Sequence, residues 1–382
     1  MTRHLALALL LLAGCGTSGS QLNSTDDAGV VPDGASPADL AGGGGGGDMA
    51  VVRPALGKAI DAPKGTWTWV DFPESQCHDG SATGIGVNPG TSTNVVVYMN
   101  GGGACWDYQT CFVLRTAALG PYGATQFNQQ TAGLPAGTIF DRGDPANPFK
   151  DWSFVFVPYC TGDLHGGDNV ASYMNNGTTM QFHHKGRANL EAEVPRIAGT
   201  WPSPGKLVVT GSSAGGYGAA INYDLFRRYW PTGASYMLDD SGPPLLPDDA
   251  PALAGFVKSW YTSWNLGKAI DPLCPDCMND LSQLATATSR KYPNDRMALL
   301  SSEQDQTIRG YALLSANGFQ TALNNMATTV LDPLANYRYF FVAGQTHTML
   351  GAPAGFSQQG TSLKTWITQM VNDDAGWKTL KP

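Results

Sequence analysis

The amino-acid sequence predicts an α/β fold, in which helices cover a mostly parallel β-sheet within one large domain. Continuous apolar, β-branched runs such as residues 95–99 and 207–210 are typical of strands that are buried on both faces. Helix-length segments separate several of these runs, and this alternation favours parallel strands joined by helical crossovers. A turn built of small residues, 211–215, follows one run directly and leads into a helix-length segment.

The expected elements follow in order along the chain. Strands are expected at residues 95–99, 154–157, 207–210, 236–238, 297–300 and 339–342. Helices are expected at residues 188–197, 216–229, 308–325 and 362–371. The long connections leave room for lid-like insertions. Because ligands bind such sheets at the carboxyl ends of the strands, the residues that directly follow each strand are the candidates for a site.

Composition excludes several classes of protein. Of the 382 residues, 14% are charged, 42% are hydrophobic and 10% are aromatic. This content of apolar and aromatic residues excludes a wholly disordered chain. The net charge is −8, and nucleic-acid recognition calls for a clustered basic face, so no nucleic-acid partner is expected.

The N-terminus predicts export. Residues 1–4 form a short basic start, and the apolar run at 5–13 is too short to span a bilayer as a helix. The run ends in Leu12-Ala13-Gly14-Cys15, which resembles a bacterial lipobox, so residues 1–14 are expected to be a signal peptide and Cys15 the lipidated residue. An ordinary signal peptide with an incidental cysteine is the alternative. Because residue 16 is Gly rather than Asp, we expect a lipoprotein of the outer membrane or cell surface, or one released from the cell. The lipid would be its only membrane contact.

Residues 15–54 differ in composition from the rest of the chain. They are rich in Gly, Ala, Ser and Asp, contain a glycine run at 42–47 and include no aromatic residue. Such a segment buries too little apolar surface to offset the entropy lost on ordering, so it is expected to be a disordered tether. The folded domain is therefore expected at residues 55–382.

Beyond Cys15 the chain has an even number of cysteines, which in an exported protein points to disulfides. They are Cys77, Cys105, Cys111, Cys160, Cys274 and Cys277. Six cysteines allow fifteen sets of pairings. Spacing suggests that Cys105–Cys111 and Cys274–Cys277 close short loops, which would leave Cys77 and Cys160 as the third pair. The Cys-Pro-Asp-Cys segment at 274–277 has a redox pair or half a zinc site as its alternative. No second Cys or His pair stands at zinc-ligand spacing nearby, so no metal and no cofactor are expected.

The turn after residues 207–210 predicts a nucleophile. Residues 211–215 fit Gly-x-Ser-x-Gly with Ser213 at the centre, and the small flanking residues allow the sharp strand-to-helix turn that such a serine needs. The turn would place the Ala214 N–H at the start of a helix, where the partial positive charge favours an oxyanion. A purely structural glycine turn is the alternative.

A second glycine-rich loop follows the strand at 95–99. The segment Asn100-Gly101-Gly102-Gly103 looks like the loop of α/β-hydrolases whose backbone N–H groups complete an oxyanion hole. Glycine lets the backbone approach a substrate oxygen closely. Neither of the usual phosphate-binding glycine patterns is present in this loop.

A serine nucleophile needs a base, and in α/β-hydrolases the chain order is Ser, acid, His. His347, after the strand at 339–342, is the histidine downstream of Ser213, and as a general base it would take the serine proton. Asp305, after the strand at 297–300, is the expected acid. Glu303 is its competitor, and Asp239 and Asp240 form a third possibility, although they are expected to line the pocket.

Several blocks of the sequence resemble the pectin acetylesterase/Notum family of carboxylesterases. They are Cys77-His78-Asp79-Gly80-Ser81, residues 98–111, Asn147-Pro148-Phe149, Val157-Pro158-Tyr159-Cys160, residues 211–218, Leu238-Asp239-Asp240-Ser241-Gly242 and Gly360-Thr361-Ser362-Leu363. The blocks recur in the family's order and extend over most of residues 75–370.

The resemblance implies a serine esterase with Ser213, Asp305 and His347 as its triad. It also implies that Gly102, Gly103 and Ala214 supply the oxyanion donors. Ser302 and Asp305 match the family's Ser-x-x-Asp acid motif, and a short disulfide after the oxyanion loop is consistent with Cys105 and Cys111. The family often has a bulky aromatic residue where this chain has Gly103, which changes the pocket rim.

The expected function is therefore that of a metal-independent serine carboxylesterase that deacetylates an acetylated polysaccharide such as pectin. A fatty-acyl or lipid esterase, or a polyester depolymerase on the same triad, is the first alternative. A catalytically inactive, surface-anchored glycan-binding lipoprotein is the second. Trp260 and Trp264, in the expected lid, are candidates for stacking against a sugar.

Overall fold

The computed structural model describes residues 53–382 except 133 and 135. The expected signal peptide, Cys15 and nearly all of the expected tether lie outside the described residues. Within the described part, no helix has both the length and the apolar character that a membrane crossing requires. These residues belong to one compact unit.

The described residues build a central eight-stranded sheet with the order β1-β2-β4-β3-β7-β8-β9-β10. Its strands are β1 (Thr68–Gln76), β2 (Ala82–Asn88), β3 (Val95–Met99), β4 (Ser153–Val157), β7 (Lys206–Ser212), β8 (Ala234–Asp240), β9 (Arg296–Ser302) and β10 (Tyr337–Val342). From β4 to β10 all neighbours run parallel, whereas β2 pairs antiparallel with both β1 and β4. All six expected strands are present in this sheet, and the expected mostly parallel α/β fold is confirmed.

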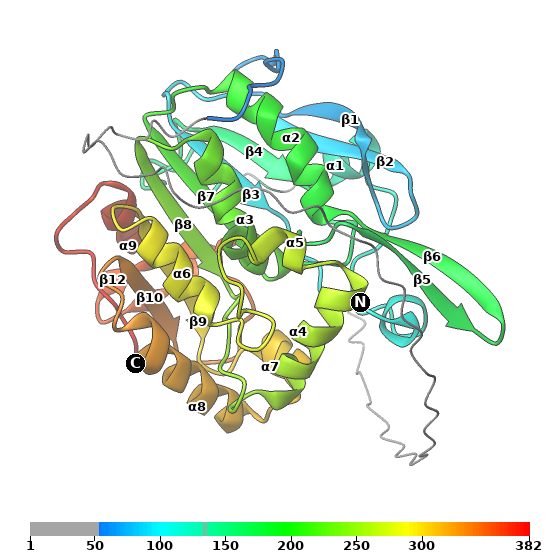
Figure 1. The fold of residues 1–382 in the computed structure, drawn as a ribbon. Helices are drawn as coiled ribbons and strands as arrows, with labels where there is room; N and C mark the ends of the chain where they lie inside the picture. The colour runs from blue at the N-terminus through cyan, green and yellow to red at the C-terminus, as the bar shows by residue number, and fades with distance from the viewer. Residues whose placement is uncertain (1–52, 133, 135) are drawn as a thin grey trace, which may run out of the picture. The chain divides into compact units, whose positions relative to one another are not determined.

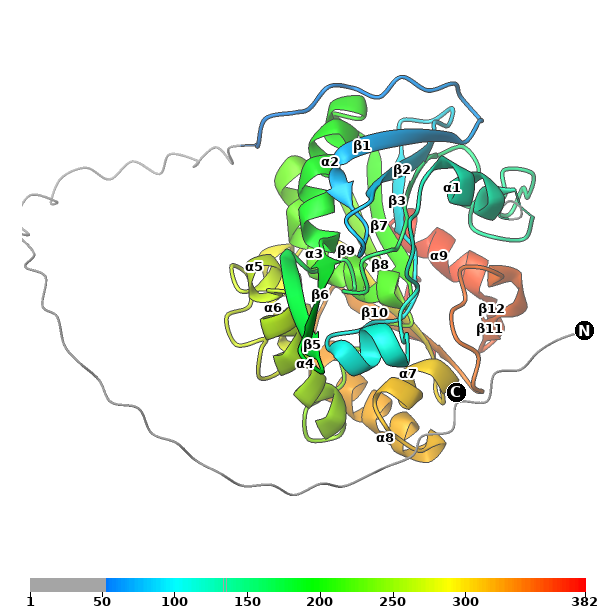
Figure 2. The same cartoon turned by 90° about the vertical axis from the view of Figure 1, so that its right-hand side faces the viewer.

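Helices cover both faces of the sheet, as Figure 2 shows. One face carries α2 (Gly186–Thr200), α3 (Ala214–Tyr229), α6 (Gln283–Lys291) and α8 (Ala316–Met326). The other face carries α1 (Ala124–Thr131) and α9 (Leu363–Val371). Successive strand residues point to opposite faces, so Val95 and Val97 belong to the first hydrophobic core and Val96 belongs to the second. Burial on both faces explains why these strands are apolar throughout.

The remaining elements lie in the connections. They are the hairpin of β5 (Asn169–Asn175) and β6 (Thr178–His184), helices α4 (Pro251–Ser263), α5 (Gly267–Ile270) and α7 (Gln306–Tyr311), the short helical turns Gln109–Val113, Ala327–Leu331 and Pro353–Gly355, and the pair β11 (Ser357–Gln358) and β12 (Thr361–Ser362). Figure 1 shows the β5–β6 hairpin extending away from the sheet. The connection from β8 to β9 is the long insertion that contains α4, α5 and α6.

The single helix expected at 308–325 is wrong, because the structure divides this stretch into α7 and α8. Leu313, between the two helices, has a left-handed backbone with φ of 55°, which a continuous right-handed helix does not contain. The Ser315 side chain then accepts a hydrogen bond from Gly318 N at 3.0 Å and caps the start of α8.

Among the described residues the cysteines form three disulfides: Cys77–Cys160, Cys105–Cys111 and Cys274–Cys277. The first ties the β1–β2 turn to the segment after β4. The second closes a short loop directly after the glycines 101–103. The sulfurs of Cys274 and Cys277 are bonded to each other and both residues are buried. This segment therefore does not supply two ligands to a zinc ion.

Candidate active site

Ser213 lies on the sharp turn between β7 and α3. Its φ of 60° and ψ of −121° are unusual for a residue other than glycine, and such strain is a feature of functional turns. The flanking glycines are a steric requirement: a Cβ on Gly211 would lie 2.3 Å from Gly215 O, and one on Gly215 would lie 1.9 Å from Met99 O. The turn therefore forms only with small residues on both sides of the serine.

Ala214 is the first residue of α3, so its N–H has no carbonyl partner within the helix. The positive end of the helix dipole lies at the same place and favours a negatively charged oxygen. Ser213 N donates to Asp240 O at 2.7 Å, which leaves the Ala214 N–H as the next donor along the turn.

The structure brings Asp305 and His347 together. Asp305 follows β9, is fully buried, and accepts hydrogen bonds at Oδ1 from Thr307 N at 2.8 Å and Ile308 N at 3.0 Å. Its other oxygen, Oδ2, lies 2.8 Å from Nδ1 of His347. With Nδ1–H donating to this carboxylate, Nε2 carries the free lone pair of the neutral ring. Nε2 is buried and has no hydrogen-bond partner within the part of the chain that is described.

Three strand ends meet at this place. Ser213, Asp305 and His347 follow β7, β9 and β10, and these strands are parallel members of one sheet. All three residues therefore lie at its carboxyl edge, where α/β proteins place their ligands.

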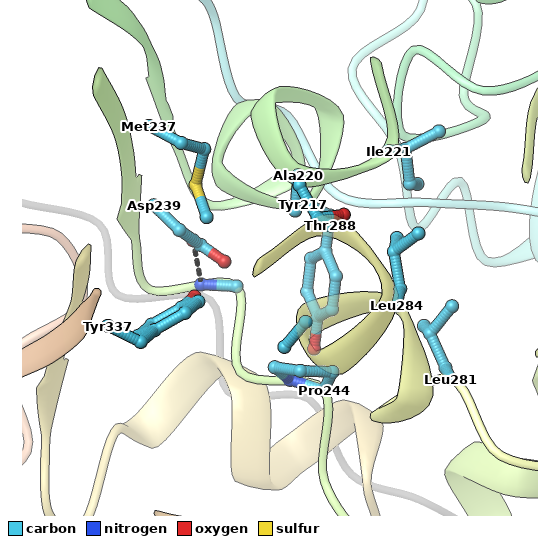
Figure 3. A pocket seen from close by; sticks show the side chains of 12 residues that line it. Tyr217, Ala220, Ile221, Met237, Asp239, Pro244, Leu281, Leu284, Thr288 and Tyr337 are labelled. Atoms are coloured by element: carbon cyan, nitrogen blue, oxygen red, sulfur yellow. Dashed lines mark hydrogen bonds between the residues drawn. The ribbon is translucent and has the colours of Figure 1, made fainter. Parts of the chain in front are cut away.

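The competing carboxylates contact other groups. Glu303 accepts from Gln320 Nε2 at 2.9 Å and from Asn324 Nδ2 at 3.5 Å, so it holds α8 rather than His347. Asp239 accepts from Gly242 N at 2.8 Å. Its side chain points into an apolar cavity on the α3 and α6 side of the sheet, as Figure 3 shows. Asp305 is thus the carboxylate that contacts the imidazole.

The glycine-rich loop after β3 is held by its carbonyl groups. Asn100 O accepts from Nε2 of His165 at 2.9 Å, and Gly102 O accepts from Ala118 N at 2.5 Å. Gly103 O accepts from the hydroxyl of Tyr159 at 2.7 Å. Each of these donors comes from outside the loop, which fixes the orientation of the peptide planes.

Gly103 occupies a position where no side chain fits. Its φ is 77°, and a Cβ there would lie 2.1 Å from Thr116 O and 2.5 Å from the hydroxyl oxygen of Tyr311. The Tyr311 hydroxyl donates to Thr116 O and accepts from Ala104 N at 3.4 Å. Tyr311 therefore fills the space beside Gly103 and connects the loop to α7, the helix that Asp305 caps.

A cleft opens beside Ser213. Its space is about 410 Å³ when the open mouth is included. It is lined mainly by apolar and aromatic side chains from four segments of the fold: Leu164, Tyr217, Leu253, Phe256, Trp260, Ile308 and Tyr311, together with Gly103, Ala104, Ser213 and Ala214.

The hypothesis that Trp260 and Trp264 stack on a sugar is wrong for Trp264, which is fully buried. Trp260 is 3% exposed and stacks on Trp264 with ring centroids 4.7 Å apart. Its ring contributes to the wall of the cleft rather than to an open surface.

Two other histidines are structural. Burial lowers the pKa of His165 to about 4 and that of His184 to about 3, so both rings are neutral near pH 7. His184 lies 3.1 Å through Nδ1 from Thr161 O and 2.8 Å through Nε2 from the Tyr173 hydroxyl. No group of three or more His, Cys, Asp or Glu side chains in the described part of the chain is arranged to hold a metal ion.

Tyr159 and Tyr311 help to hold the glycine-rich loop, a role that the sequence did not predict. Tyr159 stands two residues after β4, at the sheet edge where a site was expected, and this position was the available signal. Tyr311 offers no such signal, because its place beside Gly103 depends on how α7 packs.

The fold and this arrangement of serine, histidine and carboxylate at the carboxyl edge define an α/β-hydrolase-like protein. The model of the Pectinacetylesterase family matches residues 66–294, and the chain belongs to that family. The match includes Ser213 and ends before Asp305 and His347.

Among its relatives, pectin acetylesterase 4 of Arabidopsis thaliana is 28% identical over 207 residues, which are 52% of this chain and 49% of that protein. The palmitoleoyl-protein carboxylesterase NOTUM of Schmidtea mediterranea is 28% identical over 166 residues, or 41% of this chain and 30% of the relative. The matches thus span about half or less of these relatives. The solved structure of the Wnt deacylase Notum from Drosophila has a TM-score of 0.59 at 18% identity, covering 82% of this chain and 95% of that one, which shows a shared fold.

Proposed function

We propose that this protein is a serine carboxylesterase in which Ser213 is the nucleophile, His347 the general base and Asp305 the residue that orients the base. Gly102, Gly103 and Ala214 supply the oxyanion donors. The observation that carries the proposal is the 2.8 Å contact between Asp305 and Nδ1 of His347, at the sheet edge where Ser213 lies, together with a buried Nε2 that has no partner among the residues described. Family membership supports ester hydrolysis as the reaction.

The reaction has two halves. In the first, His347 Nε2 takes the Ser213 hydroxyl proton while the serine oxygen forms a bond to the ester carbonyl carbon. The carbonyl oxygen becomes an oxyanion that accepts hydrogen bonds from the loop amides and from Ala214 N. The bond to the alcohol then breaks, and His347 returns the proton to the leaving alcohol. In the second half a water repeats these steps and releases the acid from the acyl-enzyme.

The family supports a short acyl group. The model that matches residues 66–294, a range that includes Ser213 and the glycine-rich loop, is that of the Pectinacetylesterase family. An acetylated polysaccharide is therefore the preferred substrate class, in line with the pectin acetylesterases among the relatives.

A fatty-acyl ester is the second candidate. The aromatic and aliphatic lining of the cleft favours it, and palmitoleoyl-protein carboxylesterases are also among the relatives. A long chain would lie against the α4 side chains Leu253, Phe256 and Trp260, which line the cleft. A polyester would bind to the same apolar wall.

One set of assays tests the function. Purified protein is given p-nitrophenyl acetate and p-nitrophenyl octanoate, and acetate release from acetylated pectin is measured in parallel. We expect p-nitrophenyl acetate to be hydrolysed with the higher kcat/KM. A higher kcat/KM for p-nitrophenyl octanoate would overturn the short-acyl assignment. If no ester is cleaved, the inactive glycan-binding protein is the better account.

A matched pair of variants tests the acid. Asp305→Asn is expected to lower kcat by about 10⁴-fold, because the amide leaves the histidine in the wrong tautomer. Glu303→Gln serves as the control, and its kcat is expected to stay within about fivefold of the parent, since Glu303 contacts Gln320 and Asn324 rather than His347 and one hydrogen bond contributes about 1 kcal/mol. Equal losses in the two variants, or full activity in Ser213→Ala, would contradict the proposed triad.

The cellular location is also part of the proposal. The lipobox-like segment that ends at Cys15 supports an exported lipoprotein that its lipid holds at the outer membrane or cell surface. Replacing Cys15 by Ser is expected to release the protein from the membrane fraction of cells, and unchanged membrane association of this variant would refute lipidation.

A further inference from the structure

Asp240, at the end of β8, is a buried carboxylate with an unusually full set of donors. The residue is 0% exposed. Its Oδ2 accepts from the Ser212 hydroxyl at 2.7 Å and from Leu350 N at 3.0 Å, and its Oδ1 accepts from the Ser241 hydroxyl at 3.2 Å. Met349 N donates to both oxygens at 2.9 Å. Burial raises the pKa of this carboxyl, whereas the hydrogen bonds from Leu350, Ser212 and Met349 act in the opposite direction and favour the anion.

Apart from Ser241, which directly follows Asp240, these donors come from the segments of the proposed nucleophile and the proposed base. Ser212 directly precedes the proposed nucleophile and is the register partner of Asp240 in the parallel pair of β7 and β8. Met349 is two residues past the proposed base, His347. The main chain of Asp240 adds a further contact, since its carbonyl accepts from Ser213 N at 2.7 Å. One residue thus holds the serine turn and the histidine loop together.

The histidine loop needs such a restraint. Thr348, the residue after His347, has a φ of 67°, which is a strained left-handed conformation for a β-branched residue. Its N–H donates to the Ser241 hydroxyl at 3.3 Å, and that hydroxyl in turn donates to Asp240. Strain of this kind persists only where the surroundings impose it.

We propose that Asp240 is a positioning residue that fixes His347 against Ser213 through the segments 212–213 and 348–350. The inference rests on the proposed serine-esterase function and deepens it, because it adds a second carboxylate to the machinery with a role different from that of Asp305. Asp305 orients the imidazole ring, whereas Asp240 places the backbone on which the ring is carried.

Asp239 provides a matched control on the same strand. It is the preceding residue, it is 1% exposed, and its side chain points to the other face of the sheet. There it receives a hydrogen bond from Gly242 N and faces an apolar cavity lined by Met237, Tyr337 and others (Figure 3). Burial raises the pKa of Asp239 well above its usual value, so Asn is close in shape and charge to the protonated side chain.

The test compares Asp240→Asn, Asp239→Asn and Ser212→Ala in the full chain, with p-nitrophenyl acetate as substrate. Asp240→Asn replaces one acceptor oxygen by an amide that faces the donors of Ser212 and Leu350. We expect kcat to fall about 100-fold, the cost of a displacement near 1 Å in an active site. KM should stay within about threefold, because Asp240 is not among the residues that line the cleft. The rate of inactivation by phenylmethylsulfonyl fluoride should fall in parallel with kcat, since it reports on the serine–histidine pair.

For Asp239→Asn we expect kcat within about twofold of the parent, and for Ser212→Ala a loss of about fivefold, the effect of one hydrogen bond. Equal losses in Asp239→Asn and Asp240→Asn would show a general effect of altering a buried strand and would overturn the inference. If Asp240→Asn does not fold, as judged by near-ultraviolet circular dichroism, Ser212→Ala decides: a selective loss of kcat supports the inference and an unchanged kcat overturns it.

The outcome is separable from that of the proposed function. If Ser213→Ala and Asp305→Asn are inactive while Asp240→Asn keeps kcat within about threefold of the parent, the esterase stands and the positioning role falls. If Ser213→Ala retains hydrolysis, both fall together.

Discussion

The substitution Gly103→Ala probes the proposed oxyanion loop with a single methyl group. The φ of 77° at this position costs an L-residue about 1–2 kcal/mol by itself. The new Cβ would also lie 2.1 Å from Thr116 O, and it must move away by about 0.9 Å or more to reach the 3.0 Å that real Cβ atoms keep. Thr116 O is backbone and is held by the Tyr311 hydroxyl, so the loop itself has to shift.

The expected loss follows from that displacement. A shift near 1 Å removes the Gly103 amide from the position where it would stabilise an oxyanion, and loss of one such donor lowers kcat by about 10²–10³-fold. KM is expected to change little, because the donor acts on charge that develops in the transition state. The assay is steady-state hydrolysis of p-nitrophenyl acetate, with thermal unfolding measured in parallel.

Gly177→Ala separates backbone strain from the clash. Gly177, in the turn between β5 and β6, has a φ of 81° and no atom within 4 Å of an added Cβ. It should lose about 1 kcal/mol of stability and no activity. If Gly103→Ala destabilises the protein as much as this control does and yet keeps kcat within about threefold, residues 102–103 are not the oxyanion donors.

Two further predictions concern stability. Burial raises the pKa of Glu193 to about 8 from 4.5, and one of its oxygens has no partner among the described residues. The folded state therefore holds this proton more tightly, so the stability contribution is complete below pH 4.5 and is lost as the pH rises to about 8, by at most about 1.4 kcal/mol per pH unit. Glu193→Gln should remove this pH dependence of stability and be more stable than the parent at pH 9. Urea unfolding of both proteins at pH 5, 7 and 9 measures this. If the stability of the two proteins changes with pH in the same way, the assignment is contradicted. Loop entropy predicts that removing Cys77–Cys160, with a separation of 83 residues, costs about 4–5 kcal/mol, against about 2 kcal/mol for Cys105–Cys111, whose separation is 6. Denaturant midpoints of the two double-alanine variants measure this, and equal costs would show that unfolded-state entropy is not the main term.

The sequence was sufficient for those strands that are buried on both faces. Residues 95–99 are apolar throughout, and β3 spans the same residues. It was insufficient for β2, whose glycines at 84 and 86 give it a poor strand propensity. Those glycines are there for contacts: a Cβ on Gly84 would lie 2.0 Å from Val70 O, and one on Gly86 would lie 2.1 Å from the Phe127 ring. Gly84 contacts the paired strand β1, and Gly86 contacts α1, which lies about forty residues further along the chain. Local sequence pattern predicts neither contact.

The local sequence pattern also could not decide which of the candidate carboxylates contacts the histidine. Glu303 and Asp305 both follow β9 within three residues, and either has the chemistry to orient a histidine. Only the packing of α7 and α8 decides: Asp305 caps α7 and faces His347, while Glu303 turns to Gln320 and Asn324. The family's Ser-x-x-Asp motif pointed to Asp305, because a motif shared by a family reflects the packing that its members have in common.

In the proposed oxyanion loop, the glycines and the rest of the fold have different roles. Glycine permits the left-handed backbone at residue 103 and the close approach to Thr116, but it stabilises no single conformation and increases the entropy lost on folding. Preorganisation comes instead from His165, Ala118 and Tyr159, whose donors hold three of the loop's carbonyl groups. Because a peptide plane carries its C=O and the next residue's N–H on opposite sides, fixing these carbonyls also fixes the N–H groups of Gly101, Gly103 and Ala104, of which Gly103 is a proposed donor. A glycine-rich loop is therefore rigid only inside this particular set of contacts, and for this reason its proposed role as an oxyanion donor depends on residues that no glycine motif contains.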